Sequence, residues 1–143
     1  MTRHMAEMVK LLQQYAALPV MGSGDRVQVL LVTSRGTGRW IIPKGHPEKK
    51  MKPSEVAAME AFEEGGVSGT VGKVPLGHYQ SAKRLASGTV VPCEVTVFRL
   101  DVTEHRLRKT KRRMEVSPLP SQGAKRSAAA SFQARACHSG SRR

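Results

Sequence analysis

The stretch "WIIPKGHPEKKMKPSEVAAMEAFEEGGV", residues 40–67, decides how this sequence is interpreted. It places Glu60, Glu63 and Glu64 within a single segment of five residues. The whole chain has only 11 Asp and Glu residues and a formal net charge of +13. A basic chain that concentrates its few carboxylates in this way makes them the first candidates for a functional site.

The segment "SEVAAMEAFEE" within this stretch predicts a helix. Pro53 stands just before it, which favours a helix start, and Glu55 suits the positive end of the helix dipole. The pair Gly65-Gly66 follows and provides a stop signal. The three carboxylates therefore lie at the C-terminal end of the predicted helix.

On a helix, Glu60 is three residues from Glu63 and four from Glu64, which places all three toward one side. Like charges at these spacings repel by a few tenths of a kcal/mol per pair. The cluster is either a solvated acidic face or a site that a divalent cation neutralises. Mg²⁺ prefers carboxylate oxygens and substrate phosphates, whereas no Cys and His spacing typical of zinc is present.

The region from Gly45 to Val67 resembles the Nudix box, G-x5-E-x7-R-E-U-x-E-E-x-G-U, in which U is a bulky aliphatic residue. The spacing holds without a gap over 23 positions, with matches at Gly45, Glu60, Glu63, Glu64, Gly66 and Val67. The lead-in "VLLVTSRGTGRWIIPKG" and the later "SAKRLASGTVVPCEV" are similar to bacterial members that resemble diphosphoinositol polyphosphate phosphohydrolases. The resemblance covers roughly residues 27–103.

This resemblance implies an α/β fold, a Nudix-type α/β/α sandwich with a mixed sheet, and a Mg²⁺-dependent (or Mn²⁺-dependent) pyrophosphohydrolase. It implies that Glu60 and Glu63 are catalytic, with Glu60 acting as a ligand or as the base that takes a proton from water. The implied metal ligands are the side chains of Glu60, Glu63 and Glu64 and the backbone carbonyl of Gly45.

Two positions depart from the box, because Met51 replaces its first Glu and Met59 replaces its Arg. The family's Arg orients the neighbouring Glu, so its loss puts the placement of Glu60 in question. One hypothesis is that the two thioethers pack together and hold the loop to the helix. The alternative is that Met59 faces the core and Met51 faces solvent. A second reading of the chain is therefore a catalytically weak binding or regulatory protein with a Nudix fold.

Basic residues surround the box and suit a highly phosphorylated substrate, since Arg forks onto phosphate and Lys acts as a point charge. The resemblance favours Lys44, Lys83, Arg84 and Arg39 as substrate-binding residues, among a wider basic set that adds Arg35, Lys49, Lys50 and Lys52. Both diphosphoinositol polyphosphates and dinucleoside polyphosphates fit this charge. Base-stacking candidates are Trp40 and Tyr79, and Trp40 is equally suited to packing. His46 and His78 are either phosphate donors or surface residues.

The rest of the chain predicts three parts. A short amphipathic helix is expected within residues 1–21, a Nudix domain over residues 22–117, and a basic tail over residues 118–143. Within the domain, strands are expected at "RVQVLLVTSR", "WIIP", "TVGKVPLGHYQSAKRL" and "GTVVPCEVTVFRLDV". Core candidates in the last of these are Val95, Val97, Leu100 and the small hydrophobe Cys93.

The charge is unevenly distributed, with 13 Lys and Arg against 9 Asp and Glu in residues 1–103, and 11 against 2 in residues 104–143. "KRRMEVSP" is expected to supply a final strand. The tail beyond it has few large apolar residues, so the C-terminal element is expected to be degenerate or disordered. The tail is a candidate for nucleic-acid binding, an inert extension, or the product of a shifted reading frame. Two cysteines and no long apolar run favour a reduced, cytoplasmic setting without a membrane span.

Overall fold

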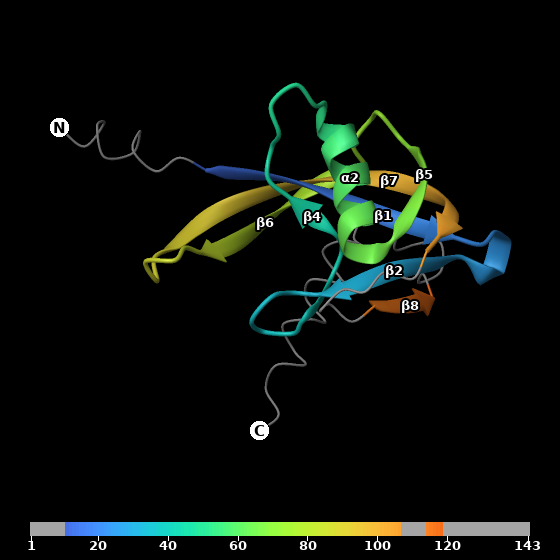
Figure 1. Cartoon of the computed structure of the whole chain (residues 1–143), viewed down its shortest axis with the longest axis horizontal. Helices are drawn as coiled ribbons and strands as arrows, with labels where there is room; N and C mark the ends of the chain where they lie inside the picture. Colours follow the sequence, from blue (N-terminus) through green and yellow to red (C-terminus); the bar gives the residue numbers. More distant parts are fainter. Residues whose placement is uncertain (1–10, 107–113, 119–143) are drawn as a thin grey trace.

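The computed structural model describes residues 11–106 and 114–118. Within these ranges the chain forms an eight-stranded mixed sheet and one α-helix, which lies across one face of the sheet (Figure 1). The elements are β1 (Leu12–Met21), a 3₁₀ turn η1 (Gly24–Arg26), β2 (Gln28–Thr33), β3 (Trp40–Ile41), β4 (Lys44–Gly45), α2 (Pro53–Gly65), β5 (Val67–Val71), β6 (Gly77–Arg84), β7 (Val90–His105) and β8 (Met114–Pro118). The predicted α/β class and mixed sheet are confirmed. The C-terminal element and the basic tail, predicted over residues 118–143, lie almost wholly outside the described ranges.

Strand β1 corrects the prediction of an N-terminal helix, which is wrong for residues 12–21. This strand pairs in parallel with β7, from Leu12 opposite Cys93 to Val20 opposite Asp101. Its other edge pairs antiparallel with β2 and β4. The run from Ala16 to Val20 is buried throughout, as expected of a strand enclosed on both faces. Its apolar spacing fits a helix as well as a strand, and the partners that decide between them lie far along the chain.

The sheet follows the order β3-β2-β1-β7-β5, with β4 on β1, β6 on β7 and β8 on β2. Strand β8 confirms the predicted final strand and pairs antiparallel with β2. Strand β4 pairs with the middle of β1, with Gly45 opposite Tyr15 and Lys44 opposite Ala16. Successive residues of a strand face opposite sides, so Gly45 faces the helix and the Lys44 side chain faces away from it.

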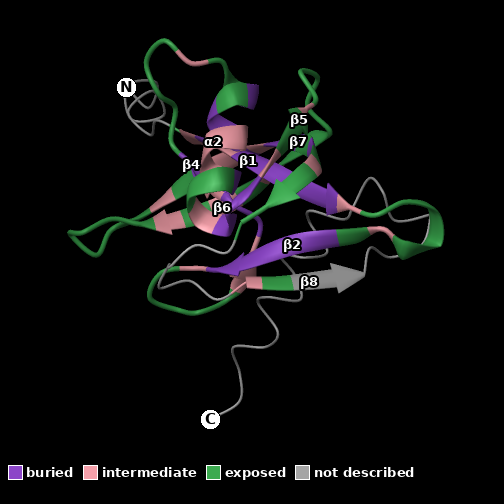
Figure 2. Ribbon diagram, turned by 45° about the vertical axis from the view of Figure 1, so that its right-hand side comes forward, coloured by how far each residue is buried: buried purple, intermediate pink, exposed green. Residues whose placement is uncertain are grey.

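Apolar side chains occupy both faces of the sheet, because the residues of β1, β2 and β7 alternate between two cores. Figure 2 shows that β1 and β2 are buried over most of their length. The helix-side core consists of Ala17, Leu30, Ala57, Ala61, Val67, Phe98 and Leu100. The opposite core consists of Ala16, Leu18, Val20, Val29, Leu31, Ile42, Cys93, Val95 and Val97. The predicted burial of Cys93, Val95, Val97 and Leu100 is therefore confirmed.

Helix α2 begins and ends where the sequence predicts. The Glu55 carboxylate accepts a hydrogen bond from the Lys52 backbone N–H at 3.1 Å, which satisfies one of the donors at the helix start. At the other end, Gly66 has a left-handed φ of 68°, and its N–H donates to the Phe62 carbonyl at 3.0 Å. The small residues Ala57 and Ala61 let the helix approach the sheet closely.

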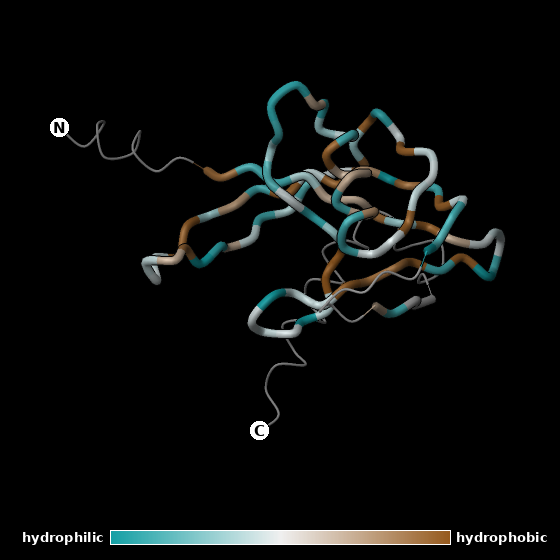
Figure 3. Tube along the Cα trace, viewed as in Figure 1, coloured by the Kyte–Doolittle hydropathy of each residue, from teal (hydrophilic) through white to brown (hydrophobic). Residues whose placement is uncertain are grey.

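The connection between β4 and α2 is a hydrophilic loop that projects from the body (Figure 3). Residues 46–50 of this loop are exposed. Among the described residues, no helix has the length and apolar character needed to cross a membrane.

Candidate functional site

Strand β4 holds two of the three clustered carboxylates near the C-terminal end of α2, Glu60 and Glu64. Glu60 is half-buried and packs against Gly45. A Cβ atom added to Gly45 would lie 2.7 Å from Glu60 Cγ and closer still to the Glu60 carboxylate, so only glycine fits there without moving Glu60. One helical turn later, Glu64 Oε2 accepts a hydrogen bond from the Lys44 backbone N–H at 3.3 Å. The missing side chain of Gly45 and the N–H of Lys44 together fix where these two carboxylates lie.

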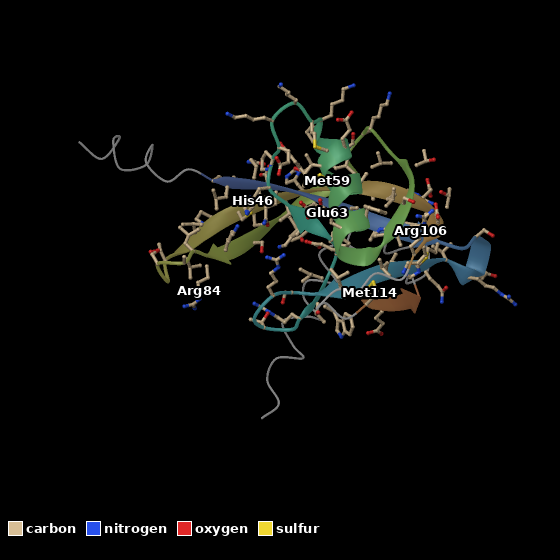
Figure 4. All side chains as sticks on the ribbon, viewed as in Figure 1. His46, Met59, Glu63, Arg84, Arg106 and Met114 are labelled. Atoms are coloured by element: carbon tan, nitrogen blue, oxygen red, sulfur yellow. The ribbon has the colours of Figure 1, made fainter. Side chains whose placement is uncertain are left out.

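Glu63 differs from its two neighbours, because its side chain is exposed on α2 (Figure 4). Within the described ranges, no three His, Cys, Asp or Glu side chains converge on one point. The structure thus brings Glu60, Glu64 and β4 together, whereas the Glu63 side chain is exposed.

A cleft of about 770 Å³ opens beside β4 and gathers most of the predicted substrate-binding cations. Its charged lining comes from four parts of the chain, namely the β2–β3 turn, β4, β6 and the end of α2. The charged residues are Arg35, Arg39, Lys44, Lys83, Arg84 and one carboxylate, Glu64. All four favoured residues therefore lie on one cleft, next to a carboxylate held by β4.

The remaining predicted cations lie elsewhere, since Lys49, Lys50 and Lys52 are exposed on the loop and are not part of the cleft lining. Figure 4 shows Arg84 near the end of β6, well away from the helix. The cleft thus extends from Glu64 of α2 outward along β6.

Lys44 is the most enclosed of these cations. Burial lowers the pKa of its ammonium group, and the positive charges of Arg39 and Lys83 act in the same direction. The neighbouring Cys93 and Glu64 oppose this shift. A partly desolvated cation interacts more strongly with an anion than a fully hydrated one does, which suits Lys44 to phosphate binding.

The thiol of Cys93 lies under the cationic part of the cleft. It donates a hydrogen bond to Gln14 Oε1 at 3.3 Å, and Gln14 itself lines the cleft. Burial raises the pKa of the Cys93 thiol, although Lys44 and Lys83 both act to lower it. Because burial dominates, Cys93 is a protonated core residue, as predicted.

His46 contacts Lys83 directly, with its Nε2 against the Lys83 ammonium group. Burial lowers the pKa of His46, and the adjacent charge of Lys83 lowers it further. A neutral imidazole can accept a hydrogen bond from the ammonium group, so His46 can hold Lys83 in place. His78 is exposed on β6 and is not among the cleft residues.

No aromatic side chain is among the described residues that line the cleft. Trp40 and Tyr79, the predicted base-stacking candidates, both pack against the opposite core. The Tyr79 hydroxyl is buried without a hydrogen-bond partner in the described structure, and burial raises its pKa. The packing alternative for Trp40 is therefore the one that the structure supports.

Met51 and Met59 are both half-buried. This differs from the alternative in which Met59 faces the core and Met51 faces solvent. Figure 4 places Met59 on α2 above Glu63. Contact between the two thioethers stays a prediction.

The sequence did not single out Gln14, Ser34 or Thr37, which also line the cleft. A hydroxyl or amide in a turn or strand carries no local signal of function. Gln14 reaches the cleft through the pairing of the strands, whereas Ser34 and Thr37 lie in the same turn as Arg35 and Arg39. The run "SRGTGR", residues 34–39, combines two arginines with a serine, a threonine and two glycines, and this pattern could have drawn attention to the turn.

Comparisons with known proteins agree with the resemblance seen in the sequence. No family model matches the chain. It is 44% identical over 54 residues to diphosphoinositol polyphosphate phosphohydrolase 3-beta of Bos taurus, a match that covers 37% of this chain and 32% of the relative. It is 41% identical over 70 residues to diphosphoinositol polyphosphate phosphohydrolase 2 of Rattus norvegicus, covering 48% of this chain and 38% of the relative. The matches thus span about a third of the length of these curated relatives.

The fold is similar to that of solved Nudix structures. A NUDIX hydrolase from Nitrosomonas europaea superposes with a TM-score of 0.61 at 21% identity, covering 93% of this chain and 92% of that one. The Ap4A hydrolase of C. elegans gives a TM-score of 0.55 at 15% identity, covering 91% of this chain and 98% of that one. The chain therefore has the Nudix fold, and its sequence resembles the diphosphoinositol polyphosphate phosphohydrolases.

Proposed function

We propose that this chain is a phosphoanhydride hydrolase that uses Mg²⁺ or Mn²⁺ to cleave a polyphosphorylated small molecule. The observation that carries the proposal is the position of Glu64. Its carboxylate is hydrogen-bonded to β4 beside Glu60 and Gly45, and it also lines the cleft with five cations. Glu60 and Glu64, which could bind a cation, therefore lie next to a basic cleft that could bind phosphates.

The donor set suits Mg²⁺, which is commonly bound by one or two carboxylates together with substrate phosphates and retained waters. Glu60, Glu64 and the carbonyl of Gly45 would hold the ion, and Glu63 is a further candidate ligand from the same helix. When bound, such an ion neutralises phosphate charge and lowers the pKa of a coordinated water.

The chain's own residues would act in two groups. Lys44, Lys83, Arg84 and Arg39 would bind the phosphate oxygens and hold the anhydride against the carboxylates. Glu60, half-buried against Gly45, would either bind the ion or accept a proton from the attacking water, with Glu63 as the other catalytic candidate. Holding the anhydride and the base in fixed positions supplies much of the rate enhancement in such reactions.

Among substrates, the lining favours a diphosphoinositol polyphosphate. Five cations suit a compound that is highly phosphorylated, and the absence of an aromatic residue from the described lining removes the usual stacking surface for a base. The names of the curated relatives point the same way. A dinucleoside polyphosphate is the second candidate, in line with the Ap4A hydrolase of similar fold.

The test is phosphate release from a panel of anhydrides with and without millimolar Mg²⁺. The panel includes a diphosphoinositol pentakisphosphate, Ap4A and ADP-ribose. We expect metal-dependent release that is greatest with the first compound and that falls about 100-fold or more in Glu60→Gln and Glu64→Gln.

Glu115→Gln is the matched control, because Glu115 is an exposed carboxylate on β8. Glu63→Gln tests the exposed carboxylate separately. Absence of metal-dependent release from every compound would refute the proposal.

A second candidate is a Nudix-fold protein that binds phosphorylated ligands with little hydrolysis. It is favoured by the finding that no three acidic, Cys or His side chains converge among the described residues, together with Met59 in place of the box Arg. Calorimetric binding of the same panel without turnover would support this function. Nucleic-acid binding through residues 118–143 concerns a segment almost wholly outside the described ranges.

A further inference from the structure

The turn between β2 and β3, residues 34–39, is closed by hydrogen bonds between its two ends. The Ser34 N–H donates to the Arg39 carbonyl at 2.7 Å, and the Gly38 N–H donates to the Ser34 carbonyl at 3.2 Å. Gly36 and Gly38 have φ values of 82° and 65°, which a residue with a side chain adopts only with strain. These hydrogen bonds and the two positive φ values hold the backbone of the turn in one tight conformation.

A second set of hydrogen bonds connects the side chains of the turn. The hydroxyl oxygens of Ser34 and Thr37 lie 2.6 Å apart, so one donates to the other. The Arg39 N–H donates to Ser34 Oγ at 3.0 Å, and Arg39 Nε donates to Thr37 Oγ1 at 3.2 Å. Arg39 is therefore held at its backbone by Ser34 and at its guanidinium by Thr37.

Such a constraint is unusual for an exposed arginine. A long surface side chain normally samples many rotamers, and ordering it for binding loses conformational entropy. The Nε bond fixes the plane of the guanidinium, whose donors form a rigid fork suited to phosphate oxygens. The constrained arginine is also in the right place, because Ser34, Thr37 and Arg39 all line the cleft beside Lys44 and Lys83.

We propose that Thr37 is a positioning residue that sets the Arg39 guanidinium on the cleft wall, where it binds a phosphoryl group. This inference rests on the proposed function in taking the ligand to be phosphorylated. Thr37 acts through Arg39 and has no role at the reacting atoms. Its loss affects how tightly the anion binds and leaves the turnover of bound substrate unchanged.

The experiment measures the dissociation constant of inorganic tripolyphosphate by isothermal titration calorimetry, using the full chain without added metal. We expect Thr37→Val to weaken binding about fivefold, since the loss of one such hydrogen bond changes an equilibrium by roughly this factor. Thr37→Ser restores the hydroxyl and is expected to bind like the wild type. In steady-state assays Thr37→Val should raise KM with kcat unchanged.

The matched control is Thr89→Val in the turn between β6 and β7. Thr89 is also an exposed threonine whose hydroxyl oxygen is paired with a serine, as Ser87 Oγ donates to Thr89 Oγ1 at 3.1 Å. It is not one of the residues that line the cleft. We expect no change in tripolyphosphate binding for this variant.

A double-mutant cycle separates positioning from general damage to the turn. In an Arg39→Ala background, Thr37→Val should have no further effect on binding. If Thr37→Val weakens tripolyphosphate binding equally in the wild-type and Arg39→Ala backgrounds, the inference is overturned. It is also overturned if Thr37→Val binds tripolyphosphate as the wild type does, or if the wild type does not bind it. The binding assay involves no hydrolysis. If the chain hydrolyses no anhydride but the double-mutant cycle gives the expected result, the proposed function is refuted and the role of Thr37 stands.

Discussion

The acidic and basic halves of the site are built in different ways. The carboxylates come from five consecutive residues of one helix, and two of them are held by the backbone of β4. The cations come from three segments between Arg35 and Arg84, and two of them, Arg39 and Lys83, are in contact with other side chains. Thr37 bonds to Arg39, and His46 contacts Lys83.

This difference implies different sensitivities. The acidic half depends on a close approach between α2 and β4 that leaves no room for an added atom at Gly45. The basic half is distributed around a cleft, where losing one contact leaves the others in place. Substitutions at Gly45 should therefore act mainly on turnover, and substitutions of the cleft cations mainly on substrate affinity.

The largest effect is expected for Gly45→Ala. The added Cβ would overlap the carboxylate end of Glu60 and force it to move. Displacing a catalytic group by about 1 Å can lower the rate about 100-fold, and we expect kcat/KM to fall by about this factor. The atoms displaced belong to a flexible side chain, so the thermal midpoint should change little. Steady-state kinetics and calorimetry check both parts. A variant with unaltered kcat/KM would show that β4 does not position Glu60.

A smaller effect is expected for Lys83→Ala on the basic side. Removing one charge-assisted contact to phosphate should raise KM about tenfold and leave kcat within about twofold. Lys49→Ala provides the control, because Lys49 is an exposed lysine on the β4–α2 loop and not a cleft residue. Equal changes in KM for the two variants would mean that general surface charge, and not the cleft, attracts the substrate.

The same contrast explains what the sequence could predict. The acidic half is local in sequence, so helical periodicity and the spacing from Gly45 to Val67 were enough to identify it. The start and end of α2 also followed from local signals, Pro53 and Gly66. What could not be foreseen is that Glu63 is exposed, because its direction depends on how the helix packs on the sheet.

The basic half and β1 show the limit of local patterns. The apolar run of β1 fits a helix or a strand, and its partner β7 lies about 80 residues further along the chain. The favoured cations were chosen by resemblance, but their common cleft and the contact of Lys83 with His46, 37 residues away, depend on the tertiary structure. Residue type alone does not reveal such contacts.

Restoring the box arginine tests whether the acidic half needs it. Because Glu60 and Glu64 are already held by Gly45 and the Lys44 N–H, we expect kcat/KM of Met59→Arg to stay within about threefold of the wild type. Met59→Leu controls for loss of the thioether in this half-buried position. A large rise in activity for the arginine variant alone would show that the contacts at β4 are a poor substitute.

The smallest effect concerns pH and the contact between His46 and Lys83. The pKa of His46 in the folded chain lies below its ordinary value of 6.5, through burial and the charge of Lys83. Between these two pKa values the unfolded chain binds more protons than the folded chain, so the free energy of unfolding falls as the pH is lowered below about 6.5. Above that pH the contribution of His46 is fully retained.

His46→Gln removes this titration while keeping an oxygen that can accept a hydrogen bond from Lys83. Between pH 7.5 and pH 5.5 the thermal midpoint of the wild type should therefore fall by about 1–3 °C more than that of the variant. Differential scanning calorimetry at the two pH values measures the difference directly. Parallel decreases would mean that the imidazole and the ammonium group are too well hydrated to interact. In that case Arg39, held by Ser34 and Thr37, is the fixed cation of the basic half, and the contrast between the two halves becomes sharper.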